Sequence, residues 1–240
     1  MEDKNILVFL PTYNEKENIS SIIEEILSSD LPVGILVVDD QSPDGTGEIV
    51  EELTQKYSQV DIIHRPPPRG RGRGGIDGLK YASNQPVEYI IEMDADFSHH
   101  PKYIPMLVDA CKNGDVVIGS RYVKGGGVEG WGLNRKINSA VANLISKILF
   151  GFKVKDSTSG YRCYKREVLA SLDWNNMISV GPSIVEEVLY KIVRQKKWKV
   201  VEIPIIFKDR TEGKSKISLI WILRWIRNLL EVRLQKQSKK

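Results

Sequence analysis

The sequence is poor in cysteine and has no long hydrophobic run. Its two cysteines, Cys111 and Cys163, have no metal-binding spacing and are too few for a disulfide framework, so we expect a reducing cytosol. Residues 1–4 are acidic and lack the charged-then-apolar order of a signal peptide. The apolar run at residues 217–223 is far shorter than the ~20 residues that cross a bilayer. We therefore expect neither a signal peptide nor a transmembrane helix.

An excess of one charge is also missing, since 35 Lys+Arg and 31 Asp+Glu leave a net charge of +4. Basic residues cluster at residues 65–73, at 194–199 and from Arg224 onward. Such clusters favour phosphate-bearing ligands or an anionic membrane face, and solvated charge without a partner is the alternative, which we adopt for residues 194–199. A length of 240 residues with 41% hydrophobic residues fits one catalytic domain with a small appendage.

The first half of the chain alternates short β-branched runs with segments of helical period, which predicts an α/β fold with a parallel sheet flanked by helices. Strands are predicted at residues 5–10, 33–38, 60–64, 88–93 and 115–119. Asn14 is predicted to cap a helix over residues 15–27 with the buried stripe Ile19, Ile22, Ile23 and Ile26. Pro101 is predicted to begin another helix, with Ile104, Leu107, Val108 and Cys111 buried.

The alternation stops after Ser120. The elements predicted beyond it are a glycine-rich stretch at residues 124–132, a helix at 134–150, an extended segment at 161–164, a helix at 183–195, a strand at 200–207, a polar loop at 208–216 and an amphipathic helix from residue 217. The last of these has apolar residues interspersed with arginines, which suits either a membrane interface or packing on the catalytic domain. The sequence leaves these two alternatives open.

Polar clusters follow strands at residues 11–15, 39–40 and 92–96. Parallel sheets bind ligands at the carboxyl ends of their strands, so these clusters are candidates for a site. Asp94 and Asp96, at positions i and i+2, project to one side of an extended backbone and can hold a hard divalent cation together with water and phosphate oxygens. A lone Asp-x-Asp is more often a solvated turn, but the coincidence of clusters at one sheet edge favours a metal-diphosphate site.

The motifs at residues 10–15, 37–46 and 93–101, followed by those at 119–122, 156–162, 209–210 and 213–216, resemble the family-2 glycosyltransferases of GT-A fold. The resemblance is strongest to the dolichol-phosphate mannose synthases and covers nearly the whole chain. It implies a Rossmann-like, mostly parallel sheet flanked by helices, with a catalytic domain at residues 1–216 and a C-terminal amphipathic helix at residues 217–240.

The resemblance also implies roles for individual residues. The residues implied to bind the donor are Pro11, Tyr13, Glu15, Val38, Asp40, Asp94, Ala95, Asp96, Arg210 and Lys216. Asp96 is implied to ligate Mg²⁺ or Mn²⁺, and Ser98 stands where some relatives have a second, glutamine ligand. Arg210 and Lys216 are implied to close over the donor diphosphate, so that they act in catalysis together with Asp96. The positions implied to bind the acceptor phosphate are Arg121, Arg135 and Ser139.

The activity implied by the resemblance is transfer of mannose from GDP-mannose to dolichyl or polyprenyl phosphate with inversion. The protein would lie on the cytoplasmic face of a membrane as a peripheral protein, with no nucleic-acid partner. A UDP-glucose-dependent polyprenyl-phosphate glucosyltransferase is the alternative within the enzyme class. An inactive nucleotide-binding regulator is the alternative from another class.

One stretch departs from the relatives' pattern. Where they carry a lysine-containing glycine motif, residues 66–75 hold Arg69, Arg71 and Arg73 among prolines and glycines. Any of these arginines could attract phosphates in place of that lysine. The same stretch imitates a dinucleotide-binding motif, but prolines separate it from the strand, so we reject that interpretation. For His99 and His100, which precede Pro101, a capping or loop role is predicted.

Overall fold

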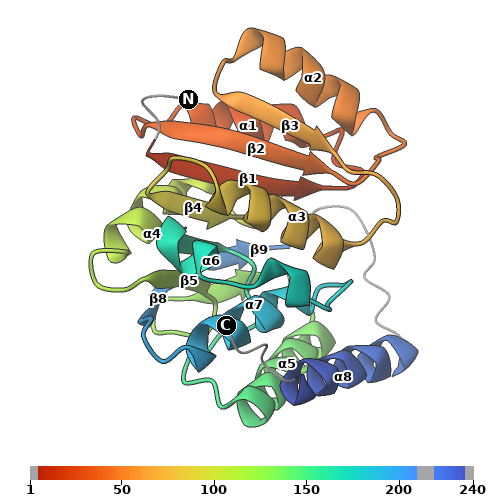
Figure 1. The fold of residues 1–240 in the computed structure, drawn as a ribbon, viewed down its shortest axis with the longest axis vertical. Helices are drawn as coiled ribbons and strands as arrows, with labels where there is room; N and C mark the ends of the chain where they lie inside the picture. Colours follow the sequence, from red (N-terminus) through yellow and green to blue (C-terminus); the bar gives the residue numbers. More distant parts are fainter. Residues whose placement is uncertain (1–4, 210–218, 236–240) are drawn as a thin grey trace.

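The computed structural model describes residues 5–209 and 219–235. A seven-stranded sheet runs through it in the order β3-β2-β1-β4-β7-β5-β8 (Figure 1). Its strands are β1 Ile6–Thr12, β2 Val33–Asp39, β3 Val60–His64, β4 Tyr89–Glu92, β5 Val116–Ser120, β7 Arg162–Lys165 and β8 Val200–Pro204. Strand β7 is antiparallel to both of its neighbours and all other pairs are parallel, so the predicted mostly parallel sheet is confirmed.

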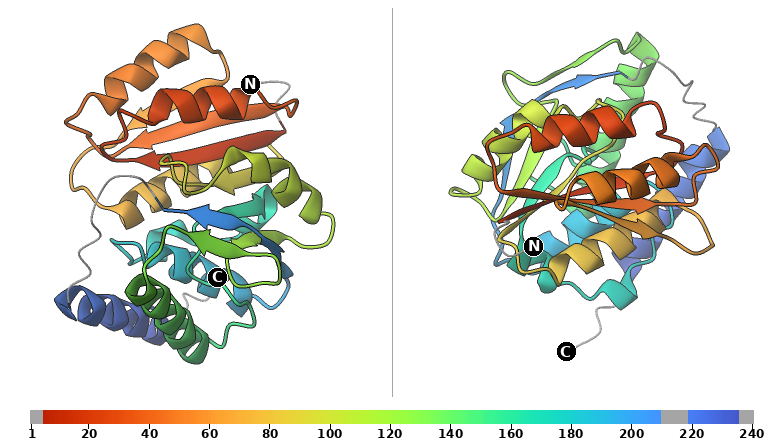
Figure 2. Two further views of the ribbon diagram at one scale, coloured as in Figure 1. Left: turned by 180° about the vertical axis from the view of Figure 1, so that it is seen from behind. Right: turned by 90° about the horizontal axis from the view of Figure 1, so that it is seen from above.

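Helices cover both faces of this sheet (Figure 2). They are α1 Ile19–Leu27, α2 Thr46–Lys56, α3 Arg71–Ser83, α4 Ile104–Ala110, α5 Leu133–Phe150, α6 Arg166–Ala170, α7 Ile184–Arg194 and α8 Leu219–Leu234, with short 3-10 turns η1 Pro101–Tyr103 and η2 Trp174–Asn176. Along β1, Val8 packs with α1 and α4 on one face, whereas Phe9 packs with α3, α6 and α7 on the other. Burial on both faces explains why β1, β2 and β5 read as nearly continuous apolar runs.

The start of α1 corrects the sequence prediction. The helix begins at Ile19 with Asn18 at its N-cap, so Asn14 is not the cap. Asn14 instead has a left-handed φ of 59°, and its backbone N–H donates to Ser42 Oγ at 3.0 Å. This turn directs residues 13–15 towards the loop that follows β2. The predicted isoleucine stripe of α1 is fully buried and therefore confirmed.

The predicted strand over residues 200–207 divides at Ile205. Its second part is β9 Ile206–Lys208, which leaves the main sheet and pairs with β6 Gly127–Glu129. Ile205 is buried and its N–H donates to Ser120 O, which fixes the point of division. The bend carries Phe207 and Asp209 to the end of β5, where the candidate site lies.

Helices α5 and α8 lie side by side at one end of the molecule (Figures 1 and 2). Leu229 and Val232 bury one face of α8 against the catalytic domain. Asn228 Oδ1 accepts hydrogen bonds from Ser179 Oγ and Ser183 Oγ at 2.9 and 2.6 Å. Of the alternatives left open above, packing on the domain thus holds for this face. Among the described residues, no helix combines the length and apolarity needed to cross a bilayer.

Candidate active site

A cavity of about 690 Å³ opens at the carboxyl ends of β1, β2 and β4, beside the first turn of α3. All the predicted donor-binding residues that the structure describes line it, namely Pro11, Tyr13, Glu15, Val38, Asp40, Asp94, Ala95 and Asp96. We call it the donor cavity. The alignment of parallel strand ends brings together these segments, which lie far apart in the chain.

Asp40 fixes one wall of the donor cavity. Its Oδ1 is ion-paired with Arg65 Nη1, and its Oδ2 accepts from the backbone N–H of Gly70 at 2.6 Å. Arg65 is almost fully buried and also donates to Asp77 at 2.7 Å. Asp40 thus holds the segment from Arg65 to Gly70 against the cavity. The remaining lone pairs of its carboxylate can accept further hydrogen bonds.

Asp94 and Asp96 lie in a tight loop directly after β4. The N–H of Asp94 donates to His99 Nδ1 at 3.0 Å, and Arg71 Nη2 lies 3.4 Å from Asp94 Oδ1. Asp96 Oδ1 accepts from the N–H and the hydroxyl of Ser98 at 3.1 and 2.5 Å. Ser98 therefore orients the carboxylate of Asp96. Outer-shell residues of metal sites orient the metal ligands through hydrogen bonds of this kind.

The donor set fits a divalent cation of the Mg²⁺ type. Within residues 5–209 and 219–235, no three His, Cys, Asp or Glu side chains gather into a complete metal-binding cluster. Asp94 and Asp96 nevertheless line the cavity wall together, and Asp96 is oriented by its hydrogen bonds. Mg²⁺ and similar ions are commonly held by one or two carboxylates while water and phosphate oxygens complete the shell.

The two histidines have different surroundings. His100 Nδ1 accepts from the N–H of Lys102 at 3.3 Å at the start of η1, as the predicted capping role requires. His99 is buried and stacks on Tyr161 with ring centroids 5.0 Å apart. Burial lowers the pKa of His99, and its Nδ1 acts as an acceptor, so the neutral ring carries its proton on Nε2. His99 thus holds the loop that contains Asp94 in place through this hydrogen bond.

A second cavity, of about 390 Å³, lies between α5, α7, α8 and β9, and we call it the acceptor cavity. The residues that line both cavities are Asp94, Asp96, Thr158, Gly160 and Pro182. The predicted acceptor-phosphate residues Arg121, Arg135 and Ser139 all line the second cavity. Much of its remaining wall is apolar, formed by Val141, Ala142, Ile145, Phe207, Ile222 and Trp225.

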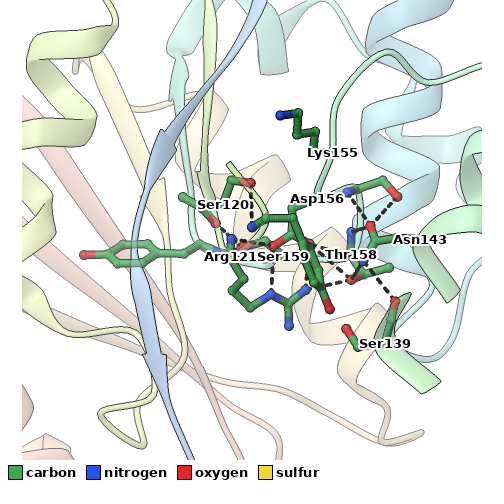
Figure 3. Close-up of polar contacts among 12 residues, drawn as sticks. Ser120, Arg121, Ser139, Asn143, Lys155, Asp156, Thr158 and Ser159 are labelled. Carbon is green, nitrogen blue, oxygen red and sulfur yellow. Dashed lines mark hydrogen bonds and ion pairs between the residues drawn. The ribbon is translucent and has the colours of Figure 1, made fainter. Parts of the chain in front are cut away.

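Arg121 is held by a buried network at the end of β5 (Figure 3). Its Nε and Nη2 donate to the two carboxylate oxygens of Asp156 at 2.8 and 2.6 Å, and Nη2 also donates to Thr158 Oγ1 at 2.8 Å. Asn143 of α5 donates to the same Thr158 oxygen at 3.0 Å. Burial alone would raise the pKa of Asp156, but the hydrogen bonds and charge of Arg121 outweigh it and hold the pKa below its usual value.

Arg135 reaches the same cavity from α5. It is ion-paired with Asp209, and its guanidinium lies 4.4 Å from the centroid of the Trp131 ring. Arg121 approaches that ring as well, at 5.4 Å. The two arginines therefore share one aromatic support, which holds both cations at the cavity wall. Arg210 and Lys216, predicted to close over the donor, lie outside the described residues.

Sequence reasoning missed Glu186, which lies in the wall of the acceptor cavity and is 3% exposed. Burial raises its pKa to about 7, although a hydrogen bond from Trp225 and the charge of Arg162 oppose the shift. A signal was present in the sequence, because two acidic residues interrupt the apolar run from Ile184 to Leu189. An acidic residue in such a run lies either in the hydrophobic core or at a functional site.

The family model for glycosyl transferase family 2 matches residues 7–173, which include all three strand-end clusters and the Arg121–Asp156 network. The chain belongs to glycosyl transferase family 2. It is therefore a glycosyltransferase. A polyprenol monophosphomannose synthase of Mycolicibacterium smegmatis is 40% identical over 214 residues, covering 88% of this chain and 80% of the relative. An undecaprenyl-phosphate mannosyltransferase of Micrococcus luteus is 35% identical over 213 residues, covering 89% of this chain and 87% of the relative.

Solved structures agree on the fold of this family 2 glycosyltransferase. A glucosyl-3-phosphoglycerate synthase from Mycobacterium tuberculosis, in complex with Mn²⁺, UDP and its glucosylated product, has a TM-score of 0.67 at 20% identity and covers 96% of this chain and 79% of its own. A mannosyl-3-phosphoglycerate synthase from Rubrobacter xylanophilus has a TM-score of 0.68 at 16% identity, covering 96% and 73%. The predicted GT-A architecture is thereby confirmed.

Proposed function

We propose that the protein transfers mannose from GDP-mannose to dolichyl or polyprenyl phosphate. The observation that carries this proposal is the meeting of the donor cavity with an apolar cavity that presents Arg121 and Arg135. Arginine suits a phosphate because its planar fork binds two oxygens and stays charged. An apolar wall beside such a phosphate site fits an acceptor with a hydrocarbon chain.

The relatives support the sugar and the acceptor. Both curated relatives are named for the transfer of mannose to a polyprenyl lipid, and each matches most of this chain. The guanine base rests on the resemblance of the strand-end motifs alone. A glucosyltransferase that uses UDP-glucose is the second candidate, because neither cavity wall identifies the base or the sugar directly.

The chemistry we propose needs no general base. A phosphate monoester has its second pKa near ~6, so the acceptor is largely dianionic at neutral pH. Arg121 and Arg135, with Ser139 beside them, hold this phosphate so that one oxygen faces the anomeric carbon at the junction of the cavities. A single displacement then inverts the anomeric configuration. Retention in the product would exclude this mechanism.

The donor side stabilises the departing diphosphate. We assign Asp96 as the residue that holds Mg²⁺ or Mn²⁺. Ser98 orients Asp96 by a hydrogen bond, and Asp94 contacts the donor. Bound there, the cation would neutralise charge on the leaving group. Arg210 and Lys216, which precede α8 in the sequence, are proposed to close over the diphosphate. Pro11, Tyr13, Glu15, Val38, Asp40 and Ala95 are proposed to complete the donor site.

We also propose that the protein binds a membrane surface at the α5 and α8 end, as a peripheral protein. Exposed apolar residues recur along α5 at helical spacing, namely Leu133, Ile137, Val141, Leu144 and Ile148. Leu223, Leu230 and Leu234 are exposed on α8. Lys136, Lys147 and Arg227 lie among them and are exposed, which suits anionic headgroups. We propose a division into a catalytic domain at residues 1–216 and a C-terminal segment at residues 217–240. In this division, one face of α8 packs on the domain and its exposed residues contact the membrane.

The decisive experiment offers GDP-mannose, UDP-glucose and UDP-GlcNAc in turn, with polyprenyl phosphate and Mn²⁺, and scores the glycolipid formed. We expect product from GDP-mannose. Product from UDP-glucose alone would overturn the mannose assignment in favour of the second candidate. Nucleotide binding without product from any donor would favour an inactive regulator.

A further inference from the structure

Arg71 begins α3 at the point where the donor and acceptor cavities meet. Its Nη2 donates to Glu92 Oε1 at 3.1 Å and lies 3.4 Å from Asp94 Oδ1. The same nitrogen is 3.9 Å from where a Cβ on Gly160 would lie, and Gly160 lines both cavities. Arg71 itself lines the donor cavity. The sugar–phosphate bond that breaks during transfer must lie near this junction.

The guanidinium of Arg71 is not saturated. Its Nη1 is shielded from solvent and has no hydrogen-bond partner among the described residues. Gly75 leaves room for this nitrogen, since a Cβ there would lie 3.3 Å from it. A guanidinium carries five N–H donors, and a shielded donor without a partner is costly. The side chain as a whole is 28% exposed and lines the donor cavity, so a ligand oxygen at the junction can accept from those guanidinium N–H groups that reach the cavity surface.

The first turn of α3 is fixed firmly against the cavity. Gly70 N–H donates to Asp40 at 2.6 Å and Gly72 N–H donates to Val180 O at 3.1 Å. A Cβ on Gly72 would lie 2.3 Å from Ser179 O, so only glycine fits there. Gly70, Arg71 and Gly74 of this segment line the donor cavity. The positive end of the helix dipole thus faces the cavity and favours an anion.

We propose that Arg71 is a donor-binding residue that contacts the β-phosphate of the nucleoside diphosphate. This inference rests on the proposed function and deepens it. As the sugar–phosphate bond breaks, its electron pair passes to the β-phosphate oxygen, and Arg71 donates a hydrogen bond to the charge that develops there. Asp94 and Glu92 hold the guanidinium at that place before the donor binds. Arg71 is thus the member of the arginine-rich stretch to which we assign a phosphate contact.

The competing explanation is structural. Glu92 is 2% exposed, and Arg71 is a cation placed to neutralise it. Removal of Arg71 alone would then harm the site by leaving a buried carboxylate unpaired. The variants Arg71→Leu, Glu92→Gln and the double variant Arg71→Leu/Glu92→Gln separate these explanations, because the double variant removes both members of the Arg71–Glu92 pair and so leaves neither without the other. Arg73→Leu is the matched control, since Arg73 is on the same helix but lines neither cavity.

The affinities of GDP and GMP are measured by calorimetry with Mn²⁺ present, with UDP and UMP in parallel, and thermal melts check folding. We expect Arg71→Leu and the double variant to bind GDP about ten- to hundredfold more weakly, and GMP and the Arg73→Leu control to change little. Recovery of GDP affinity in the double variant would overturn the proposal, as would equal losses for GDP and GMP or no loss at all.

This experiment is independent of the proposed function. Nucleotide affinity is measured without an acceptor, so failure of the unmodified chain to form mannolipid would count against the proposed function only. If the protein binds uridine nucleotides more tightly, the affinities for UDP and UMP are compared instead, and the same outcomes apply. A KM for GDP-mannose that rises in parallel with the GDP dissociation constant, at similar kcat, would place the contact in the ground state as well.

Discussion

Arg121 and Asp156 form a buried two-point ion pair in which Nε and Nη2 donate to separate carboxylate oxygens at 2.8 and 2.6 Å. The Asp156 side chain is fully buried and that of Arg121 is 8% exposed. The acceptor phosphate of the proposed function would therefore meet an arginine whose orientation is already set by Asp156, Thr158 and the Trp131 ring. Orientation by the protein lowers the cost of ordering the cation when the phosphate binds.

Replacement of Asp156 by Asn should be strongly destabilising. The change leaves the charge of Arg121 buried without its counterion, and breaking a buried pair costs about 3–5 kcal/mol. Urea denaturation measures the loss, and the KM for the polyprenyl phosphate should rise as well. Asp109→Asn is the control, because Asp109 and its partner Lys112 are 68% and 75% exposed and such pairs contribute about 0–1 kcal/mol. Equal stability of the two variants would contradict this account of the network.

Replacement of Glu186 by Gln should stabilise the protein in a pH-dependent way. The folded-state pKa of about 7 exceeds the ordinary value of 4.5, so the folded protein loses stability as the pH rises through this window. Glutamine does not titrate, and its advantage over glutamate should grow by roughly 3 kcal/mol between pH 4.5 and pH 7.

Denaturation at pH 5 and pH 8 tests this expectation, and a difference that does not change with pH would rule it out. Glu187→Gln is a neighbouring control. Its carboxylate accepts from the N–H groups of Ile178 and Ser179 at 3.0 and 2.8 Å and pairs with Lys191, so its loss should destabilise the fold.

Point substitutions on α5 should weaken membrane binding. Ile137→Glu and Leu144→Glu each place a charge in the exposed apolar stripe, and we expect the combined variant to bind anionic liposomes at least about tenfold more weakly. Met106→Glu on α4 is the control, since Met106 is also exposed but lies outside the stripe. Undiminished flotation of the α5 variant would remove this helix from the proposed surface. Deletion of residues 217–240 is less informative, because Leu229 and Val232 of α8 belong to the core.

The cysteines should be unreactive in the folded protein. Cys111 and Cys163 are free and fully buried, with their sulfur atoms 3.4 Å apart, and burial raises the pKa of Cys163 well above its usual value. The thiolate is the reactive form, so a thiol reagent at pH 8 should label neither residue until the protein unfolds. Rapid labelling of the native protein would show that the strand β7 region opens readily.

Much of the fold followed from local pattern. Strands β1 to β5 were predicted within a residue or two, and β1, β2 and β5 are buried along almost their whole length and therefore read as continuous apolar runs. Helix α3 was not predicted, since its first turn is rich in glycine and its position depends on contact with Val180 and Ser179. Gly78 of the same helix packs on Phe9, where a Cβ would come within 2.2 Å of the ring. Contacts between distant segments of this kind leave no local signal.

The candidate site was likewise predictable where local pattern determines it and unpredictable where contacts between distant segments do. The strand-end residues predicted to bind the donor line one cavity, because parallel topology determines where strand ends meet, and their role in donor binding stays a prediction. The partners of these residues were not foreseen, since Arg71 with Asp94 and Arg121 with Asp156 are pairs 23 and 35 residues apart in the chain. Arginines near a phosphate site can be recognised from sequence, but the carboxylate that orients each one requires the three-dimensional structure.

The residues shared by the donor and acceptor cavities bear on the kinetic scheme of the proposed transfer. Because each cavity has its own lining and the two touch only around Asp94, Asp96, Thr158, Gly160 and Pro182, both substrates can be present at once. Steady-state kinetics should therefore show intersecting lines of a ternary complex, with no exchange of label between donor and free nucleotide in the absence of acceptor. In the proposed function, the lipid product would return to the bilayer past α5 and α8, which border the acceptor cavity.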